Sequence, residues 1–511
     1  MKPAPRPRRP PYWTLVAFAV LISIPVSWAV AAMLAAVAIK LAVAAARGSA
    51  RRSAERAALQ AEGGGVRLGV DERGREVRLS DRQLAAHGLI VGASGAGKST
   101  TLLGILCDQI SRGLPVVAID LKGSPSFARE LERAAALAGR PFRVWTPDGP
   151  SHWNPLAHGN ATELKDKLIA TERFTEPHYQ RAAERYVQTA IAVLHAAGRE
   201  PQIAEVVALL EPKRLAAMVR HLDQPLASRV QDYVGGLTAD QVSAVRGLGT
   251  RLAILSESNA GPYLASAASA PGASAAPGFP ARLAPTIDLR AALEGPEVVL
   301  FSLNSSVYGK LAAQLGTLAI QDLVSAAGHR LERGDGPDAP CQATVGIDEF
   351  SALGADHVLA LLARGRGAGV SVVLATQELA DLERAGPGFR DQVLGVTAVK
   401  LAHRQDVPAS AQTISQMAGT ERVWEVTQQI GSPFSGSGSR GTRRQVEQFV
   451  VHPNEIKALQ TGQAVMLTKT PVARTTRVRV APPRHDAPSR GSSAGRHGLE
   501  RGDQPDPGVT R

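Results

Sequence analysis

The sequence predicts an α/β fold: a doubly wound domain that carries an inserted all-α domain and follows an N-terminal α-helical membrane anchor. Three observations predict it. Apolar runs of strand length alternate with helical stretches, which is typical of parallel α/β sheets. A helix-rich stretch over residues 161–255 interrupts that alternation. An almost purely apolar segment, residues 13–46, precedes both.

Length and composition limit the possible classes. The 511 residues are enough for two or three domains. The two cysteines, Cys107 and Cys341, lie far apart on apolar segments, which argues against a disulfide framework. No Cys/His cluster has metal-ligand spacing. The formal net charge of +12 suits a nucleic acid or an anionic membrane as partner.

The apolar segment 13–46 predicts a transmembrane anchor behind a basic N-terminal tail, residues 1–12. It is longer than the apolar core of a signal peptide. As one helix it would measure about 50 Å, against about 30 Å of hydrocarbon, so it forms either one long tilted span or a tight hairpin. Basic residues flank both ends, which favours the hairpin because positive charge stays in the cytoplasm.

A phosphate-binding loop follows in "HGLIVGASGAGKSTTLLGIL", residues 87–106. An apolar strand enters the loop and a helix leaves it, so backbone N–H groups and the helix N-terminus can hold phosphates. Lys98 is expected to reach the β- and γ-phosphates and Ser99 to bind Mg²⁺. The cofactors are therefore ATP and Mg²⁺, and the loop residues expected to bind nucleotide are Gly92, Ala93, Ser94, Gly95, Ala96, Gly97, Lys98, Ser99 and Thr100.

A second predicted strand, which ends in two acidic residues, lies far downstream in "ATVGIDEF", residues 343–350. Asp348 is predicted to hold the Mg²⁺ shell, and Glu349 to polarise the attacking water as general base. A glutamate directly after the aspartate favours hydrolysis over nucleotide sensing.

Other apolar runs also end in polar residues, as in "LPVVAIDLKG", "EVVLFSLN", "GVSVVLATQE" and "GVTAVKLAHR". Helical stretches such as 309–327 and 358–364 separate them. The ligand of such a sheet lies outside the carboxyl ends of its strands. Gln377, at the end of one run, is therefore expected to sense the γ-phosphate or to position water.

Together these motifs resemble type IV secretion coupling proteins, the TraD/TraG group of conjugative DNA-transfer ATPases, and more widely the FtsK and HerA class of hexameric DNA pumps. The resemblance covers about residues 65–470 and lies in "HGLIVGASGAGKSTTL", "VVAIDLKGS", "WNPLAHG", "HYQRAAERYVQTAI", "VGIDEFSALG" and "VSVVLATQEL". It implies a RecA-like motor, a homo-hexamer that hydrolyses ATP at subunit interfaces, and the threading of DNA or a DNA–relaxase complex towards a membrane channel.

The resemblance also implies the domain order. The motor comprises residues 64–160 and 286–470, with an all-α domain inserted at 161–255. Residues 265–285 are rich in Ala, Ser, Pro and Gly and predict a flexible connection. Residues 474–511, rich in Arg, Pro, Gly and Ser, predict a disordered basic tail.

The sequence departs from the family pattern at two places and leaves a third position open. Lys122 and Gly123 precede Ser124, where the family often has an acidic residue. The family's sizeable loop between two membrane helices is missing. "RGRGAG" offers Arg364 and Arg366 where the family places an arginine that acts across the subunit interface; which of the two acts stays open.

The leading hypothesis is a membrane-anchored, ATP-driven DNA translocase that serves as coupling protein in conjugative transfer. It is expected in the bacterial inner membrane, with its motor in the cytoplasm. By resemblance its partners are DNA, bound without sequence preference, a relaxase or relaxosome, and components of a type IV secretion channel. The alternatives are the ATPase of a protein-only secretion system and a nucleotide-dependent membrane scaffold.

Overall fold

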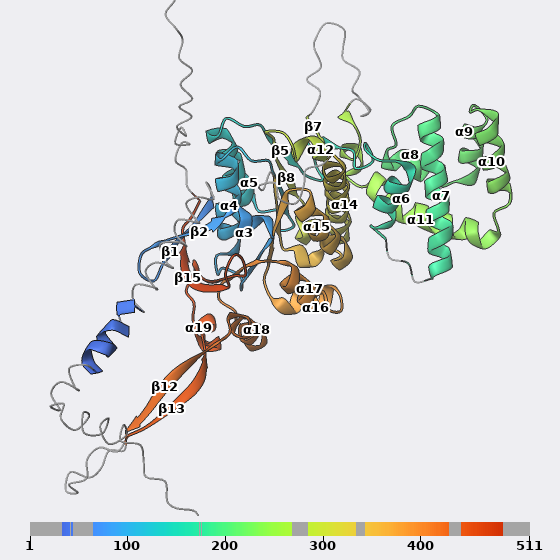
Figure 1. Ribbon diagram of the computed structural model, residues 1–511. Helices are drawn as coiled ribbons and strands as arrows, with labels where there is room; N and C mark the ends of the chain where they lie inside the picture. The colour runs from blue at the N-terminus through green and yellow to red at the C-terminus, as the bar shows by residue number, and fades with distance from the viewer. Residues whose placement is uncertain are drawn as a thin grey trace, which may run out of the picture. The chain divides into compact units, whose positions relative to one another are not determined.

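The computed structural model describes residues 33–40, 42–43, 65–172, 174, 176–267, 285–333, 343–428 and 441–483 (Figure 1). The chain divides into two units, Met1–Gly64 and Gly65–Arg511. In the first unit, residues 33–40 and 42–43 are helical and exposed; the remainder of the predicted anchor 13–46 lies outside the described residues. Within the described ranges, no helix is both long enough and apolar enough to cross a membrane.

An eleven-stranded mixed sheet forms the centre of the second unit, in the order β2-β1-β15-β14-β11-β3-β10-β9-β4-β8-β5. Seven neighbouring strands are parallel. They are β11 (Val399–Ala402), β3 (Gly88–Val91), β10 (Val370–Thr376), β9 (Ala343–Asp348), β4 (Val116–Asp120), β8 (Val298–Ser302) and β5 (Phe142–Trp145). The apolar runs predicted as strands are thus confirmed, and their polar ends meet at one edge of the sheet.

Four antiparallel strands extend the sheet beyond β11. They are β14 (Gln463–Thr468), β15 (Arg474–Val480), β1 (Gly65–Asp71) and β2 (Glu76–Ser80). The prediction that the disordered tail begins at residue 474 is therefore wrong for 474–480. That segment pairs on both sides and buries Val478, so it belongs to the motor. The rest of the predicted tail, from residue 484, lies outside the described residues.

Helices cover both faces of the sheet, as a doubly wound fold requires. One buried cluster joins the strands to α3 (Asp81–Ala85), α4 (Lys98–Ser111) and α5 (Pro125–Leu137). The other joins them to α14 (Lys310–Glu332) and α15 (Ala355–Gly367). The central strands are buried along their whole length, which is why they read as continuous apolar runs.

Within its described residues, the segment predicted as an inserted all-α domain forms helices joined by short loops. Its elements are α6 (Ala161–Ile169), α7 (Pro177–Ala196), α8 (Ile203–Leu209), α9 (Pro212–Val219), α10 (Gln224–Gly235), α11 (Ala239–Glu257) and the 3₁₀ helix η1 (Gly261–Tyr263). Local sequence sets two of the starts: Asn160 with Glu163 and Thr238 with Gln241 form capping boxes. The predicted flexible connection 265–285 lies outside the described residues, apart from 265–267 and 285.

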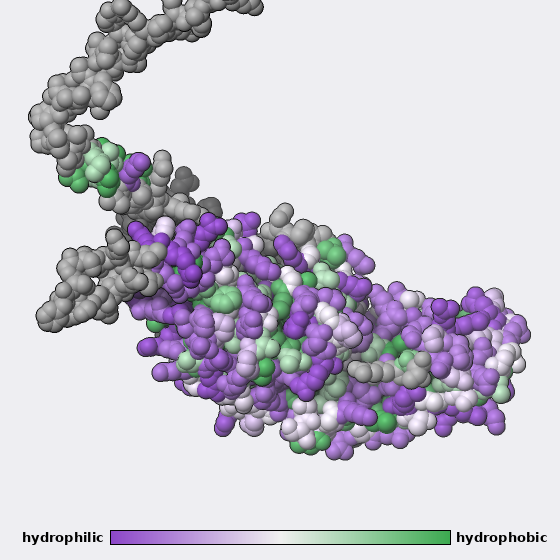
Figure 2. Space-filling model, turned by 90° about the horizontal axis from the view of Figure 1, so that it is seen from below, coloured by the Kyte–Doolittle hydropathy of each residue, from purple (hydrophilic) through white to green (hydrophobic). Residues whose placement is uncertain are grey.

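Short elements connect these parts. They are β6 (His152–Trp153), β7 (Thr286–Ile287), α12 (Leu289–Ala292), α13 (Ser305–Tyr308), η3 (Phe350–Ala352), α16 (Leu379–Ala385), α17 (Phe389–Val396), α18 (Pro408–Ala418) and α19 (Pro453–Lys457). Large exposed apolar side chains of the second unit are spread over several elements rather than gathered in one. The face shown in Figure 2 is accordingly mostly hydrophilic.

A buried ion pair joins the first inserted helix to the motor. Lys167 Nζ on α6 lies 2.7 Å from Asp322 Oδ1 on α14, and the Trp153 indole donates to Asp322 Oδ2 at 3.0 Å. Lys167 also donates to the carbonyls of Pro155 and His158. Since every charge here has partners, the cluster is satisfied. The "WNPLAHG" stretch supplies the Trp153 indole and two backbone carbonyls to this cluster.

We expect Lys167→Met to destabilise the second unit by about 3 kcal/mol, because the change leaves the buried Asp322 carboxylate without its cation. Trp153 lies in the cluster, 5.6 Å from the Trp145 ring centroid, so urea unfolding followed by tryptophan fluorescence reports it. Arg444→Met, which breaks an exposed pair with Glu425, is the control and should cost no more than about 0.5 kcal/mol. Equal midpoints for the two variants would contradict a stabilising role.

A two-stranded ribbon, β12 (Thr420–Gln428) and β13 (Gly441–Phe449), projects from the motor (Figure 1). It belongs to an insertion between β11 and β14 that also holds α18 and α19. At its root, Val450 N donates to Gly419 O at 3.0 Å. Trp424 is 52% exposed, with the Arg443 guanidinium 4.5 Å from its ring centroid. Neither strand of the ribbon was expected from the sequence.

Candidate nucleotide site

The phosphate-binding loop lies between β3 and α4, at the carboxyl edge of the parallel strands. Gly97 has φ +114° at the N-terminus of α4, in the left-handed region that a side chain rarely adopts. A Cβ added at Gly92 would lie 2.6 Å from the His403 Cβ. Gly97 therefore allows the backbone conformation of the loop, and Gly92 allows the residue after β11 to pack closely against it. Lys98 is 3% exposed.

Residues from the far end of the chain brace this loop. Ala93 N donates to Arg404 O at 2.8 Å, and Gly462 N donates to Ala96 O at 3.0 Å. The Thr461 hydroxyl donates to Gly95 O at 3.2 Å. Both ends of the β11–β14 insertion are thus bonded to the loop that would hold phosphates.

His403 completes the brace from within. Its Nδ1 lies 2.9 Å from Gln463 O and its Nε2 lies 2.8 Å from the Thr101 hydroxyl. Because a carbonyl only accepts, Nδ1 carries a proton, and the Thr101 hydroxyl lies between His403 Nε2 and Gly97 O, which is 3.1 Å away. Burial, opposed by the bond to Gln463, lowers the pKa of His403 to about 4, with the charge of Lys98 contributing. The imidazole is therefore neutral at physiological pH.

The acidic strand β9 lies two strands away from β3, with β10 between them. The Ser99 hydroxyl donates to Asp348 Oδ2 at 2.7 Å. Asp120, at the end of β4, pairs directly with Asp348 in the sheet. Burial raises the pKa of Asp348 against the Ser99 hydrogen bond. Burial also raises the pKa of Asp120 to about 6, with help from the Asp348 charge and against its backbone hydrogen bonds.

Glu349 stands at the centre of the site on a strained backbone. Its φ of +58° is left-handed, which costs a non-glycine residue about 1 kcal/mol or more. Its Oε1 accepts from Gln377 Nε2 at 3.0 Å. Lys122 Nζ lies 3.1 Å and Lys98 Nζ 3.7 Å from the same oxygen. Four side chains from three strand ends and the loop therefore converge here.

Sequence reasoning missed Lys122 as a site residue. The signal available was its place two residues beyond Asp120, at the end of an apolar run. The same reasoning predicted Lys98, Ser99, Asp348, Glu349 and Gln377, and the structure brings all five together.

Arg364 and Arg366 are not part of this cluster. They lie exposed in the last turn of α15, which ends just before β10 begins at Val370. That is the amino edge of the parallel strands, whereas the loop and the acidic residues lie at the carboxyl edge. Within one chain, neither guanidinium can serve the site that Lys98 occupies.

The donor set fits the predicted ligands. A buried, nearly unexposed carboxylate beside a hydroxyl offers two hard oxygen ligands, and Mg²⁺ takes one or two protein oxygens with phosphates and water completing its shell. The raised pKa of Asp348 indicates that its charge lacks full compensation, which a cation would supply. The backbone N–H groups at the N-terminus of α4, together with Lys98, fit a polyphosphate.

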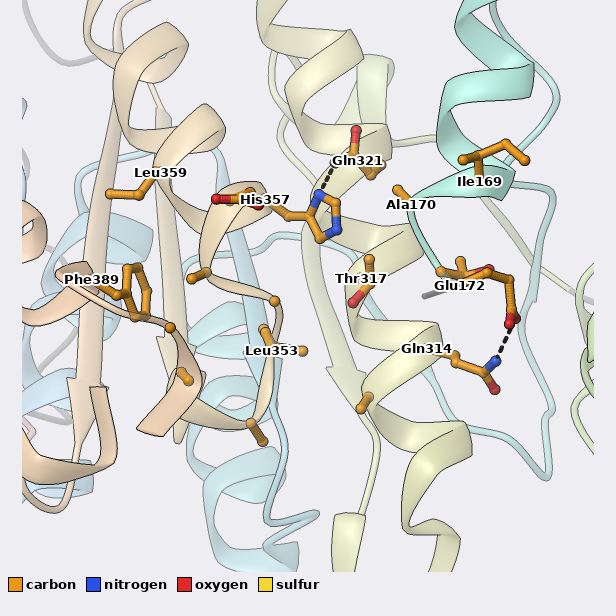
Figure 3. Close-up of a pocket in the computed structure, with 18 of the residues that line it drawn as sticks. Ile169, Ala170, Glu172, Gln314, Thr317, Gln321, Leu353, His357, Leu359 and Phe389 are labelled. Carbon is orange, nitrogen blue, oxygen red and sulfur yellow. Dashed lines mark hydrogen bonds between the residues drawn. The ribbon is translucent and has the colours of Figure 1, made fainter. Parts of the chain in front are cut away.

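A separate cleft of about 1170 Å³ lies behind the loop that follows Glu349, between that loop, α14 and the end of α6 (Figure 3). Gln321 donates to His357 Nδ1 at 2.7 Å, and Gln314 donates to Glu172 at 2.9 Å. Burial lowers the pKa of His357 against a hydrogen bond to the Ala170 backbone. The first bond joins α14 to α15, and the second joins α14 to the segment that follows α6.

Comparison with known proteins supports this reading of the fold. Residues 342–461 match a family model described as the TraM recognition site of TraD and TraG, and residues 66–137 match the HerA-like helicase C-terminal family. No protein of curated function matches the chain.

Solved structures give the same fold at low identity. The unbound conjugative coupling protein TrwB is 16% identical, with a TM-score of 0.56 over 83% of this chain and 91% of that one. Another TrwB structure, in complex with ADP and Mg²⁺, is 16% identical with a TM-score of 0.55, over 83% and 91%. VirB4 of Thermoanaerobacter pseudethanolicus is 15% identical, with a TM-score of 0.51 over 82% and 96%. The large mixed sheet therefore resembles the RecA-like P-loop ATPase fold of TrwB, and the resemblance to the TraD/TraG and HerA groups is confirmed.

Proposed function

We propose that this chain is a membrane-anchored ATPase that moves DNA as the coupling protein of a conjugative, type IV secretion-like system. One observation carries the proposal: Lys98, Ser99, Asp348 and Glu349 converge at the carboxyl edge of the parallel strands, although β10 separates β3 from β9. A nucleotide-binding protein without turnover has no need of a carboxylate next to the magnesium ligand. The order of the motifs and the net charge of +12 support DNA as the substrate.

In the proposed mechanism, the loop and Lys98 hold the β- and γ-phosphates of ATP. Mg²⁺ held through Ser99 and Asp348 would neutralise charge on those phosphates. Glu349 accepts a proton from a water molecule as the water oxygen bonds to the γ-phosphorus. The bond to the β–γ bridging oxygen breaks, ADP carries away the electron pair, and Glu349 keeps the proton until phosphate leaves.

The finer parts of the proposal concern placement and partners. Residues 13–46 would anchor the chain in the bacterial inner membrane, as one tilted span or as a hairpin, with the motor in the cytoplasm. Six copies would form a ring. The match of residues 342–461 to a TraM recognition model supports a relaxosome as partner, and the likeness to VirB4 supports components of a secretion channel.

The test of the proposal is steady-state ATP turnover by the full chain in detergent or nanodiscs, at low salt. Hydrolysis is expected to require Mg²⁺ and to rise several-fold with DNA. Turnover that is present but indifferent to DNA would favour the ATPase of a protein-only secretion system. Binding of ATP without turnover would favour a nucleotide-dependent membrane scaffold.

If Arg364 or Arg366 acts on a neighbouring subunit, two inactive variants should restore each other. The Lys98→Ala chain lacks the lysine that binds the phosphates in its own site. The Arg364→Ala or Arg366→Ala chain lacks the arginine that would act in the neighbouring subunit's site. In mixed oligomers some interfaces then combine an intact loop with an intact arginine, so part of the turnover should return. If mixtures shown to contain both chains stay inactive for each arginine, neither acts across the interface.

A further inference from the structure

The carboxylate of Glu349 is held by one of its two oxygens. All its side-chain contacts within the described residues go to Oε1, from Gln377, Lys122 and Lys98. Oε2 accepts no hydrogen bond from those residues. A general base needs one oxygen to fix its orientation and one that is free to receive the proton. The arrangement supplies both.

Local structure builds the position of Lys122 in detail. Asp120 accepts from Lys122 N at 2.9 Å and from Ser124 N at 2.6 Å, which closes a tight turn after β4. Gly123 has φ +65°, and a Cβ there would lie 2.5 Å from the Asn304 Cβ. Only glycine fits this turn. The turn aims the lysine side chain back across the strand ends towards Glu349.

Gln377 holds the same oxygen from the other side. It follows β10, the neighbour of β9, whereas Lys122 follows β4, the other neighbour of β9. Thr376, at the end of β10, accepts from Gly92 N at 3.3 Å. The two donors therefore flank the Glu349 strand, and the Gln377 side is connected to the phosphate-binding loop.

Charge favours a cation at this place. Partial burial works against the charge of Lys122, but the carboxylates of Glu349, Asp348 and Asp120 outweigh it and leave the pKa of Lys122 raised. Lys98 lies farther from Oε1 than Lys122 does, and the proposed mechanism assigns Lys98 to the phosphates. When Lys98 serves the phosphates, Lys122 is the remaining ammonium beside Glu349.

We propose that Lys122 is a positioning residue: together with Gln377 it fixes Oε1 of Glu349 so that Oε2 faces the attacking water. This inference rests on the proposed ATPase function and adds a role that the loop and the acidic strand do not contain. Lys122 acts through Glu349 and makes no contact with nucleotide.

The first test compares Lys122→Met and Lys122→Arg in the full chain. Lys122→Met should lower kcat for ATP by about ten- to a hundredfold, because a misplaced base loses rate on that scale. KM and nucleotide affinity should change less than about twofold. Lys122→Arg, which keeps a donor and a charge, should recover part of the kcat. A side chain 43% exposed is not needed for folding, and an unchanged melting temperature verifies this.

The second test is a double-mutant cycle with Glu349→Gln. If Lys122 acts through Glu349, adding Lys122→Met to Glu349→Gln should lower the residual single-turnover rate by less than about twofold, since groups acting as one unit are not additive. Full additivity would overturn the proposal, as would a large loss of nucleotide affinity in Lys122→Met, which would make Lys122 a phosphate ligand. An inactive wild-type chain would instead refute the ATPase function itself.

Discussion

Glu349→Gln is expected to abolish ATP turnover, by about a hundredfold or more, while nucleotide binding stays intact. The amide oxygen of the new side chain still accepts from Lys122 and Gln377, so the segment after β9 keeps its conformation. What is lost is the oxygen that takes the proton from water, and a general base contributes about a hundred- to ten-thousandfold. Nucleotide affinity and steady-state turnover, measured on the same preparation, check the prediction.

Two further variants serve as comparisons for Glu349→Gln, one at the phosphate-binding loop and one at an exposed carboxylate. Lys98→Ala should weaken both binding and turnover, because Lys98 is expected to hold the terminal phosphates in the ground state as well as in the transition state. Glu383→Gln, an exposed carboxylate on α16, should leave both unchanged. Wild-type turnover in Glu349→Gln would remove Glu349 from the mechanism.

DNA affinity is expected to fall by roughly a thousandfold between about 50 and 200 mM salt, with little dependence on sequence. Each phosphate neutralised by a basic side chain releases counterions, and a footprint of six or more contacts gives a slope of this size. Contacts of this kind carry no sequence information. Fluorescence anisotropy with single- and double-stranded oligonucleotides of unrelated sequence measures both properties.

The basic tail would produce a similar slope without any motor, so a shortened chain is the control. The cut belongs after Pro483, because β15 ends at Val480 and pairs with both β1 and β14. In the assembled shortened chain, DNA should still raise ATP turnover several-fold, since coupling belongs to the motor. Loss of both binding and stimulation on removal of the tail would contradict the DNA pump and favour protein secretion.

The sequence was sufficient for the site residues whose roles depend on local order. The loop from Gly92 to Thr100 and the Asp348–Glu349 pair carry their geometry in consecutive residues, and flanking strand and helix patterns complete it. Gln377 follows the rule that ligands lie at strand ends. All of them meet in the structure as expected.

Other features could not be predicted because they depend on which strands become neighbours. Lys122 reaches Glu349 only because β4 lies beside β9, and strand order is a property of the whole sheet. Composition alone places residues 474–480 in the tail, although "RTTRVRV" ends in a strand-like alternation. The ribbon strands could not be predicted either, because most of their side chains with a described burial are exposed and no buried apolar face marks them in the sequence.

The brace on the phosphate-binding loop has a consequence for the order of events during synthesis. Thr461 bonds to Gly95 across a separation of 366 residues, and His403 and Gly462 reach the same loop. The ribosome therefore completes the nucleotide motif long before the residues that hold it in shape exist. Contacts so distant in sequence form late in folding. Competence to bind ATP should accordingly arise only once almost the whole chain has emerged. A nascent chain would therefore not hydrolyse ATP before the last strands have joined the sheet.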